Sequence, residues 1–122
     1  MTETLDLIVI GAGMAGVNAA KKAAREGWSV AIVDELPYGG TCALRGCDPK
    51  KMLRAGAEAV DAARLLSGKG VAGDTRMDWP ALMKHKESFT DPVPENMEDG
   101  LKKVGVQTLH GSARFTAADR IE

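Results

Sequence analysis

Two cysteines, Cys42 and Cys47, are the side chains of this sequence best suited to chemistry. In a reducing compartment, a close cysteine pair is more often catalytic or metal-binding than a structural staple. Pro49, Lys50 and Lys51 follow the second cysteine, where a helix should begin, and both a helix N-terminus and ammonium groups stabilise a thiolate. We therefore expect thiol–disulfide exchange, in which one thiol attacks and the other resolves the mixed disulfide.

The two sulfur atoms can meet only if the chain between them departs from a regular helix. Side chains five residues apart on an ideal helix point about 140° away from each other, whereas a disulfide needs α-carbons about 4.4–6.8 Å apart. Gly46 supplies the necessary freedom. The alternatives are two unrelated buried thiols, or half of a zinc site, which would need more ligands at tighter spacing. His85 and His110 are far along the chain, so we expect solvated or locally bonded histidines and no metal site.

A second motif, Gly11-x-Gly13-x-x-Gly16, stands between an apolar run at 5–10 and an alanine-rich segment at 14–26. The run is typical of a buried parallel strand, and the segment has helical periodicity. In this position the first glycine makes a tight turn, the second lets the backbone approach a pyrophosphate, and the third allows close helix packing. The motif therefore predicts a dinucleotide site.

The predicted helix should point the backbone N–H groups of Met14 and Ala15 at the phosphates. Asp34 ends the next strand, where a carboxylate can accept hydrogen bonds from ribose hydroxyls, and Glu35 is one step too far. The alternatives are a glycine-rich turn without a ligand and a solvated carboxylate at the strand end. The loop by itself does not separate FAD from NAD(P).

These elements predict an α/β fold, a Rossmann-like doubly wound domain with a mainly parallel sheet. Pro92 and Pro94 should divide one helical stretch into two helices. A final strand should begin at Arg120 and is barely begun at Glu122, so we expect the domain, residues 1–122, to be incomplete at its C-terminus. The remaining predicted elements are a strand at 29–33, a helix at 50–66, helices within 79–104, and strands at 106–110 and 112–116.

Composition excludes several classes of partner. The chain has 122 residues, 44% of them hydrophobic, and a formal net charge of −1 with interleaved signs. It offers no single-sign field for nucleic acid or a membrane surface. The acidic start and the interrupted apolar run suit neither a signal peptide nor a membrane span, so a cytoplasmic location is the default expectation.

The segment from Gly39 to Lys51, GGTCALRGCDPKK, resembles the active-site signature of the pyridine nucleotide–disulfide oxidoreductases. Glutathione reductase, dihydrolipoamide dehydrogenase and mercuric reductase are members of that family. The glycine loop, Asp34, Asp78-Trp79 and residues 111–115 follow in the family's order, so the resemblance extends across nearly the whole chain.

The resemblance, and not the spacing, implies that the glycine loop binds FAD. It implies that Cys47 is the thiol nearest the flavin, forming a charge-transfer thiolate, and that Cys42 is the interchange thiol that attacks a substrate disulfide. Lys50 or Lys51 would supply positive charge near the flavin, and Lys50 fits the glutathione reductase pattern better. The other residues implied at the cofactor are Gly40 and Thr41 at the flavin and, through its backbone, Ala113 at the adenine.

The family pattern also implies parts that this chain does not contain. Family members are several times longer, bind NAD(P)H in a later domain, and form homodimers in which a His–Glu pair reaches the partner's active site. The expected function is thus an NAD(P)H:disulfide reductase that passes electrons through FAD to the cysteine pair and on to a small-molecule disulfide. The alternatives are dihydrolipoamide dehydrogenase or mercuric reductase activity, or a stand-alone nucleotide-binding or thiol-exchange module without flavin chemistry.

Several residues depart from the pattern of familiar members, which usually have Val-Asn-Val or Leu-Asn-Val where this chain has Ala43-Leu44-Arg45. Arg45 stands where an aliphatic residue is usual, Asp48 replaces an aliphatic residue before the proline, and Asp34 replaces the commoner glutamate. A carboxylate at Asp48 should oppose thiolate formation beside it, and Arg45 could offset that effect as a nearby cation. The choice of substrate therefore stays open.

Overall fold

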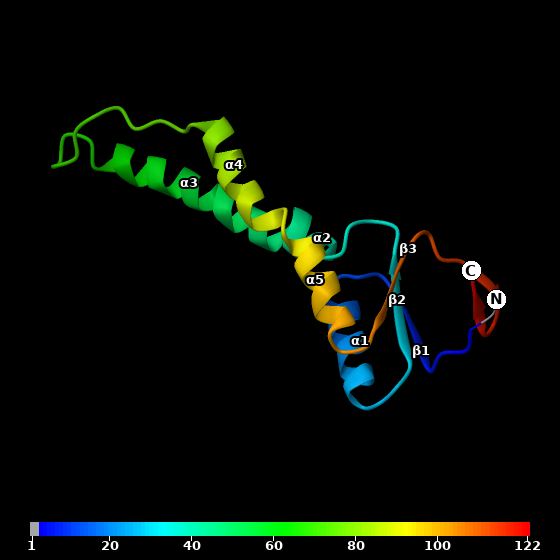
Figure 1. Cartoon of the computed structure of the whole chain (residues 1–122). Coiled ribbons are helices and arrows are strands. Elements are labelled where there is room, and N and C mark those ends of the chain that lie inside the picture. Colours follow the sequence, from blue (N-terminus) through cyan, green and yellow to red (C-terminus); the bar gives the residue numbers. More distant parts are fainter. Residues whose placement is uncertain (1–2) are drawn as a thin grey trace.

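A computed structural model of the chain describes residues 3–122; Met1 and Thr2, which the predicted domain includes, lie outside the described residues. Helices and strands alternate at first, and helices then dominate the middle of the chain (Figure 1). The elements are β1 (Leu7–Ile10), α1 (Met14–Arg25), β2 (Val30–Asp34), α2 (Gly40–Arg45), α3 (Cys47–Leu65), α4 (Trp79–Thr90), α5 (Val93–Lys102), β3 (Gln107–His110), β4 (Phe115–Ala117) and β5 (Arg120–Ile121).

The sheet consists of three parallel strands with β2 in the middle, between β1 and β3. In this register Ala31 of β2 lies between Ile8 of β1 and Gln107 of β3. The four residues from Val30 to Val33 are all buried, as expected for the central strand of a parallel sheet. The predicted α/β class with a Rossmann-like parallel sheet is confirmed.

The hydrophobic core lies between the sheet and two helices, α1 and α5, which cover the same face (Figure 1). Val17 and Ala20 of α1 and Leu101 of α5 are buried together with Ile32 of β2. Val30 and Ile32 of β2 belong to this core, and the alternating Ala31 and Val33 do not, because successive strand residues face opposite sides of a sheet. The core therefore anchors both ends of the β1–α1–β2 unit that carries the glycine loop.

Helices α3 and α4 pack side by side and project away from the sheet (Figure 1). Gly56 allows the close approach, since a Cβ at this position would lie 2.8 Å from the Leu82 side chain. Asp78 caps α4 by accepting a hydrogen bond from the Ala81 N–H at 3.0 Å. None of the helices within residues 3–122 combines the length and apolarity needed to cross a bilayer.

Most predicted elements are present; two predicted starts were wrong, and one short helix was missed. Helix α3 begins at Cys47, three residues before the predicted start at Lys50, because Asp48 and Pro49 fit its first turn, where backbone N–H groups need no helical partner. The short helix α2 was not predicted. Strand β4 begins at Phe115 and not at Ser112, and it pairs with β5 as an antiparallel hairpin.

Candidate functional site

The glycine loop connects β1 to α1 by a turn that only small residues can make. Gly11 has a φ of +100°, which favours glycine, and its N–H donates to the Val33 carbonyl at 2.8 Å. A Cβ on Gly16 would lie 2.0 Å from the Gly11 carbonyl oxygen, so α1 can pack against the loop only if residue 16 is glycine. The motif thus makes the compact strand-to-helix turn that its spacing predicted.

The N-terminus of α1 presents backbone donors to a ligand. Its first residues, Met14 and Ala15, are exposed, and no side chain within residues 3–122 caps the helix at Gly13. The first turn also carries no acidic residue that would occupy or repel an anion there. Unpaired N–H groups and the positive end of the helix dipole therefore remain available to a phosphate group.

Asp34 braces the loop from the end of β2. Its Oδ2 accepts a hydrogen bond from the Ala12 N–H at 2.7 Å, and its Oδ1 accepts one from the Leu36 N–H at 2.9 Å. Each carboxylate oxygen has a further lone pair, so Asp34 can fix the loop and still accept hydrogen bonds from a ligand. The predicted role of Asp34 at a ribose stays a prediction, and its role in bracing the loop was not predicted.

A pocket of about 180 Å³ lies at the carboxyl ends of β1, β2 and β3. Gly11, Asp34 and Ala113, which the sequence reading placed at the cofactor from three separate segments, all line this pocket. The Gly111 N–H donates to the Asp34 carbonyl at 3.0 Å and so draws the last segment toward β2. The carboxyl edge of an open parallel sheet is where such folds bind nucleotides.

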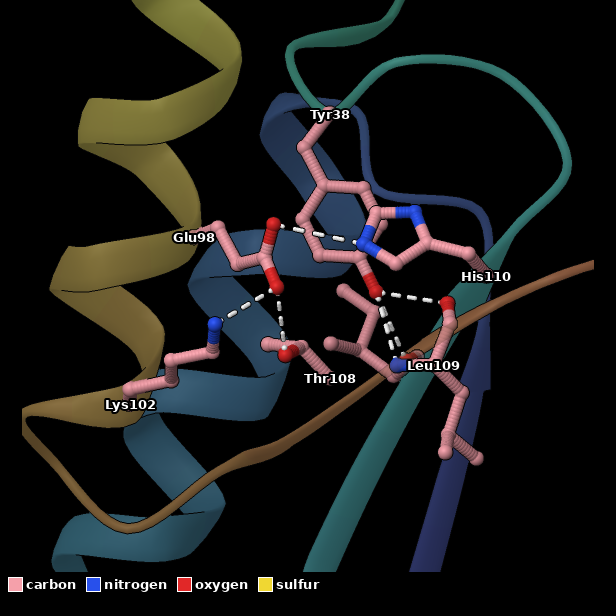
Figure 2. Close-up of polar contacts among 7 residues, drawn as sticks. Tyr38, Glu98, Lys102, Thr108, Leu109 and His110 are labelled. Carbon is pink, nitrogen blue, oxygen red and sulfur yellow. Dashed lines mark hydrogen bonds and ion pairs between the residues drawn. The ribbon is translucent and has the colours of Figure 1, made fainter.

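Tyr38 ties the segment between β2 and α2 to the sheet, as Figure 2 shows. Its side chain is buried, and its hydroxyl accepts from the Leu109 N–H at 3.0 Å and lies within donating distance of the carbonyls of Leu109 (2.7 Å) and Ile32 (3.0 Å). Burial is the main cause that raises the pKa of Tyr38 above its ordinary value. The role of Tyr38 was not predicted from the sequence, because its partner Leu109 lies 71 residues away.

Glu98 of α5 connects that helix to β3 beside Tyr38 (Figure 2). Its carboxylate accepts from Thr108 Oγ1 at 2.8 Å, lies 2.8 Å from Lys102 Nζ, and lies 3.2 Å from His110 Nε2. Lys102, followed by Thr108, lowers the pKa of Glu98 to about 2. The His110 ring also stacks on Tyr38, with ring centroids 4.8 Å apart, so this histidine is locally bonded.

The start of α2 lies directly against the glycine loop. The Gly39 N–H donates to the Ala12 carbonyl at 3.0 Å. Gly40 has a φ of +64°, and a Cβ at this position would lie 2.6 Å from the Gly13 α-carbon. Two glycine backbones therefore touch, and the helix that carries Cys42 starts where the nucleotide loop turns.

The two cysteines are adjacent thiols on either side of a helix break. Cys42 is half-buried in α2, and Cys47 is exposed as the first residue of α3. Gly46 separates the helices, and a Cβ there would lie 2.9 Å from the Thr41 carbonyl oxygen. A hydrogen bond with the Cys47 side chain, followed by burial, raises the pKa of the Cys42 thiol. The predicted distortion at Gly46 is present and brings the side chains together.

The two lysines after the cysteines point to different sides of α3. Lys51 lies 4.0 Å from the Asp48 carboxylate, and both residues line a pocket of about 270 Å³ beside Phe89. Lys50 lines a groove on another side of the helix, together with Arg45. Asp48 therefore offsets the charge of Lys51, whereas Lys50 shares its surroundings with a second cation. Within residues 3–122 no cluster of three or more His, Cys, Asp or Glu side chains could hold a metal ion.

Comparison with known proteins gives consistent matches over this whole arrangement. The family model described as "Pyridine nucleotide-disulphide oxidoreductase" matches residues 5–121. Dihydrolipoyl dehydrogenase of Chlamydia trachomatis is 39% identical over 100% of this chain and 26% of its own length. Dihydrolipoyl dehydrogenase of Haloferax volcanii is 36% identical over 90% of this chain and 23% of its own. Glutathione reductase of Burkholderia cepacia is 33% identical over 95% of this chain and 26% of its own length. The chain therefore spans about a quarter of the length of these relatives.

Proposed function

Because this chain belongs to the pyridine nucleotide–disulfide oxidoreductase family, we propose that it forms the FAD site and the redox-active cysteine pair of an NAD(P)H-dependent disulfide reductase. The observation that carries the proposal is the backbone contact between Gly13 and Gly40. It connects a loop suited to a pyrophosphate directly to the helix of the first cysteine. A dinucleotide at this loop would therefore extend toward reactive thiols.

The geometry of the loop and of the adjacent pocket fits FAD. The free N–H groups at Met14 and Ala15 suit the pyrophosphate, and the pocket that contains Asp34 and Ala113 suits the adenosine. Thr41 directly follows Gly40, whose backbone contacts Gly13, and would lie at the flavin. When bound, FAD would relay electrons from NAD(P)H, held elsewhere in the whole protein, to the cysteine pair.

The cysteines would then pass the electrons to a small-molecule disulfide. Cys42 attacks one substrate sulfur, and the other leaves as a thiolate; Cys47 then attacks Cys42 Sγ, releases the second thiol, and restores the Cys42–Cys47 disulfide. The hydrogen bond with Cys47 that raises the pKa of Cys42 disfavours its thiolate, so a base that takes the Cys42 proton would promote the attack. In the family a His–Glu pair of the partner subunit would serve as the base, so the working protein would be a homodimer.

A second candidate runs the same chemistry in the opposite direction. Dihydrolipoyl dehydrogenases are prominent among the relatives of this chain, and their name implies oxidation of a dithiol. In sequence, Lys50 fits the glutathione reductase pattern better than Lys51 does, so we retain disulfide reduction as the first candidate. A comparison of turnover with NADPH and glutathione disulfide against turnover with NAD⁺ and dihydrolipoamide separates the two.

The proposed function is tested by the visible absorption spectrum of the purified protein with FAD, recorded before and after anaerobic addition of dithionite. We expect a flavin band that gains a long-wavelength charge-transfer shoulder when the cysteines are reduced. The shoulder should disappear in Cys47→Ser and persist in Cys42→Ser, which is the matched control. A protein that holds no FAD, or a shoulder that survives in Cys47→Ser, would contradict the proposal.

A further inference from the structure

A groove of about 550 Å³ lies between the helix break at Gly46 and the facing side of α4; its lining holds neighbours of both cysteines but neither cysteine itself. Its lining includes four cations, Arg45, Lys50, Arg54 and Lys86, and no carboxylate. This volume falls in the range of sites for small organic ligands. The groove is therefore large enough for a substrate and carries charge of a single sign.

Two of these cations stand in the same relation to the two thiols. Arg45 follows Cys42 by three residues in α2, and Lys50 follows Cys47 by three residues in α3. Residues three apart on a helix lie on the same side, with Cβ atoms about 5–6 Å apart. Each cysteine thus has a cation beside it, and both cations open into the same groove.

The positive charge of these two side chains is not offset within the groove. Arg54 pairs with Glu58 at 2.7 Å, and Lys86 lies 3.8 Å from Glu87. Within residues 3–122, Arg45 and Lys50 form no ion pair. An anion entering the groove would therefore meet its strongest attraction at Arg45 and Lys50, each three residues after a cysteine.

We propose that this groove selects disulfides that carry an acid group on an apolar body, with Arg45 as the residue that determines the charge preference. Leu44, Leu53 and Met83 give the groove an apolar lining for that body. The inference rests on the proposed function for the role of the thiols. It goes further by naming the substrate class and by assigning a role to Arg45, which departs from the aliphatic residue of familiar members.

Thiol–disulfide exchange between the reduced cysteine pair and a disulfide needs no cofactor. The Cys42 thiolate forms a bond to one sulfur of the disulfide, the disulfide bond breaks, and the leaving thiolate takes the electron pair. The Cys47 thiolate then attacks Cys42 Sγ and releases the second thiolate. Two electrons pass from the chain to the disulfide, and the two cysteine protons go to solvent.

The test measures how fast the reduced chain, without flavin, reacts with three disulfides of different charge. The probes are the dianionic 5,5′-dithiobis(2-nitrobenzoate), the neutral 2,2′-dithiodipyridine and the cationic cystamine. One cation about 6 Å from a carboxylate in water changes a rate by about threefold. Compared with the unmodified chain, we expect Arg45→Gln to react about threefold more slowly with the dianion. Its rate with the neutral probe should be unchanged, and its rate with cystamine should be higher.

Two further variants separate the groove from a general charge effect. Lys86→Gln, on the α4 side of the groove, should lower the ratio of dianion to neutral rates in the same direction as Arg45→Gln. Arg64→Gln removes a cation near the end of α3, about 26 Å along the helix from Cys47 at 1.5 Å per residue, and should leave the ratio unchanged. That distance exceeds the Debye length of about 10 Å at 0.1 M salt, and raising the salt should weaken only the groove effect.

Equal losses with the dianionic and neutral probes in Arg45→Gln, or the same loss of ratio in Arg64→Gln, would overturn the inference. Because no flavin takes part in this reaction, failure of the groove proposal and failure of the reductase proposal give different results. A colourless protein that still prefers the dianion would sink only the reductase proposal. A flavin-binding protein that reacts with the three probes regardless of charge would sink only the groove proposal.

Discussion

The buried hydroxyl of Tyr38 offers the sharpest test of how the site is held together. Tyr38→Phe removes one oxygen atom and keeps the ring that stacks on His110. The Leu109 N–H then loses its acceptor at 3.0 Å, and the nearby carbonyls of Leu109 and Ile32 lose a donor. The side chain is only 1% exposed, so water cannot easily replace the missing oxygen.

The expected cost can be worked out from these contacts. A typical hydrogen bond contributes about 1 kcal/mol net, and a buried donor left without a partner costs about 1–3 kcal/mol. We therefore expect Tyr38→Phe to lower the free energy of unfolding by about 2–3 kcal/mol, a substantial share of the roughly 5–15 kcal/mol typical of a domain. The same loss should weaken FAD binding, because Tyr38 holds the end of β3 that leads into the pocket at Ala113.

Urea denaturation followed by circular dichroism measures the first effect, and titration with FAD measures the second. Thr116→Val is the matched control, since it removes an exposed hydroxyl from β4 and should change the free energy of unfolding by less than about 0.5 kcal/mol. If Tyr38→Phe unfolds at the same urea concentration as the unmodified chain, the network drawn in Figure 2 does not stabilise the fold as argued.

Two further predictions concern the same framework. Lys102 and the other partners of Glu98 lower its pKa to about 2. Its contribution to the free energy of unfolding is therefore fully present above the ordinary pKa of 4.5 and is lost as the pH falls toward 2. After allowance for solvent screening, we expect Glu98→Gln to lower the free energy of unfolding in urea by about 1–2 kcal/mol at pH 7, and by progressively less below pH 4.5. Gly40→Ala should weaken FAD binding at least about tenfold in an absorbance titration, because its Cβ would strike Gly13, whereas Gly68→Ala, with a similar φ of +73° but open space around it, should not. A Glu98→Gln cost that does not change with pH, or equal FAD affinities in the two glycine variants, would refute these arguments.

Much of the nucleotide-binding half of the fold could be predicted because its elements have local causes. The apolar run of β1, the three glycines and the small residues of α1 each determine their own conformation, and the structure has them in the predicted order. Asp34 could be placed because a strand end has a fixed position in a βαβ unit. The grouping of Gly11, Asp34 and Ala113 around one pocket then follows from three parallel strands that end at the same edge.

The features that escaped prediction depend on contacts between segments far apart in the sequence. Helix α2 has only six residues, too few for helical periodicity to show in the sequence. Gly39 and Gly40 suggest a turn in the sequence, and only the structure shows that this segment contacts the glycine loop. Tyr38 bonds to Leu109, 71 residues away, and no local pattern encodes that pairing. The start of α3 was predicted three residues too late, because a proline can either precede a helix or occupy its first turn, as Pro49 does here.

If FAD binds at the glycine loop as proposed, the contact between Gly13 and Gly40 would couple cofactor occupancy to the oxidation state of the thiols. If FAD at the loop shifts the balance between dithiol and disulfide, the law of linkage requires oxidation of the cysteines to change the affinity for FAD by the same factor. Flavin retention then becomes a readout of the redox poise of the surroundings. Two glycine backbones in van der Waals contact would thus let the protein hold its cofactor with a strength that depends on the ambient thiol potential.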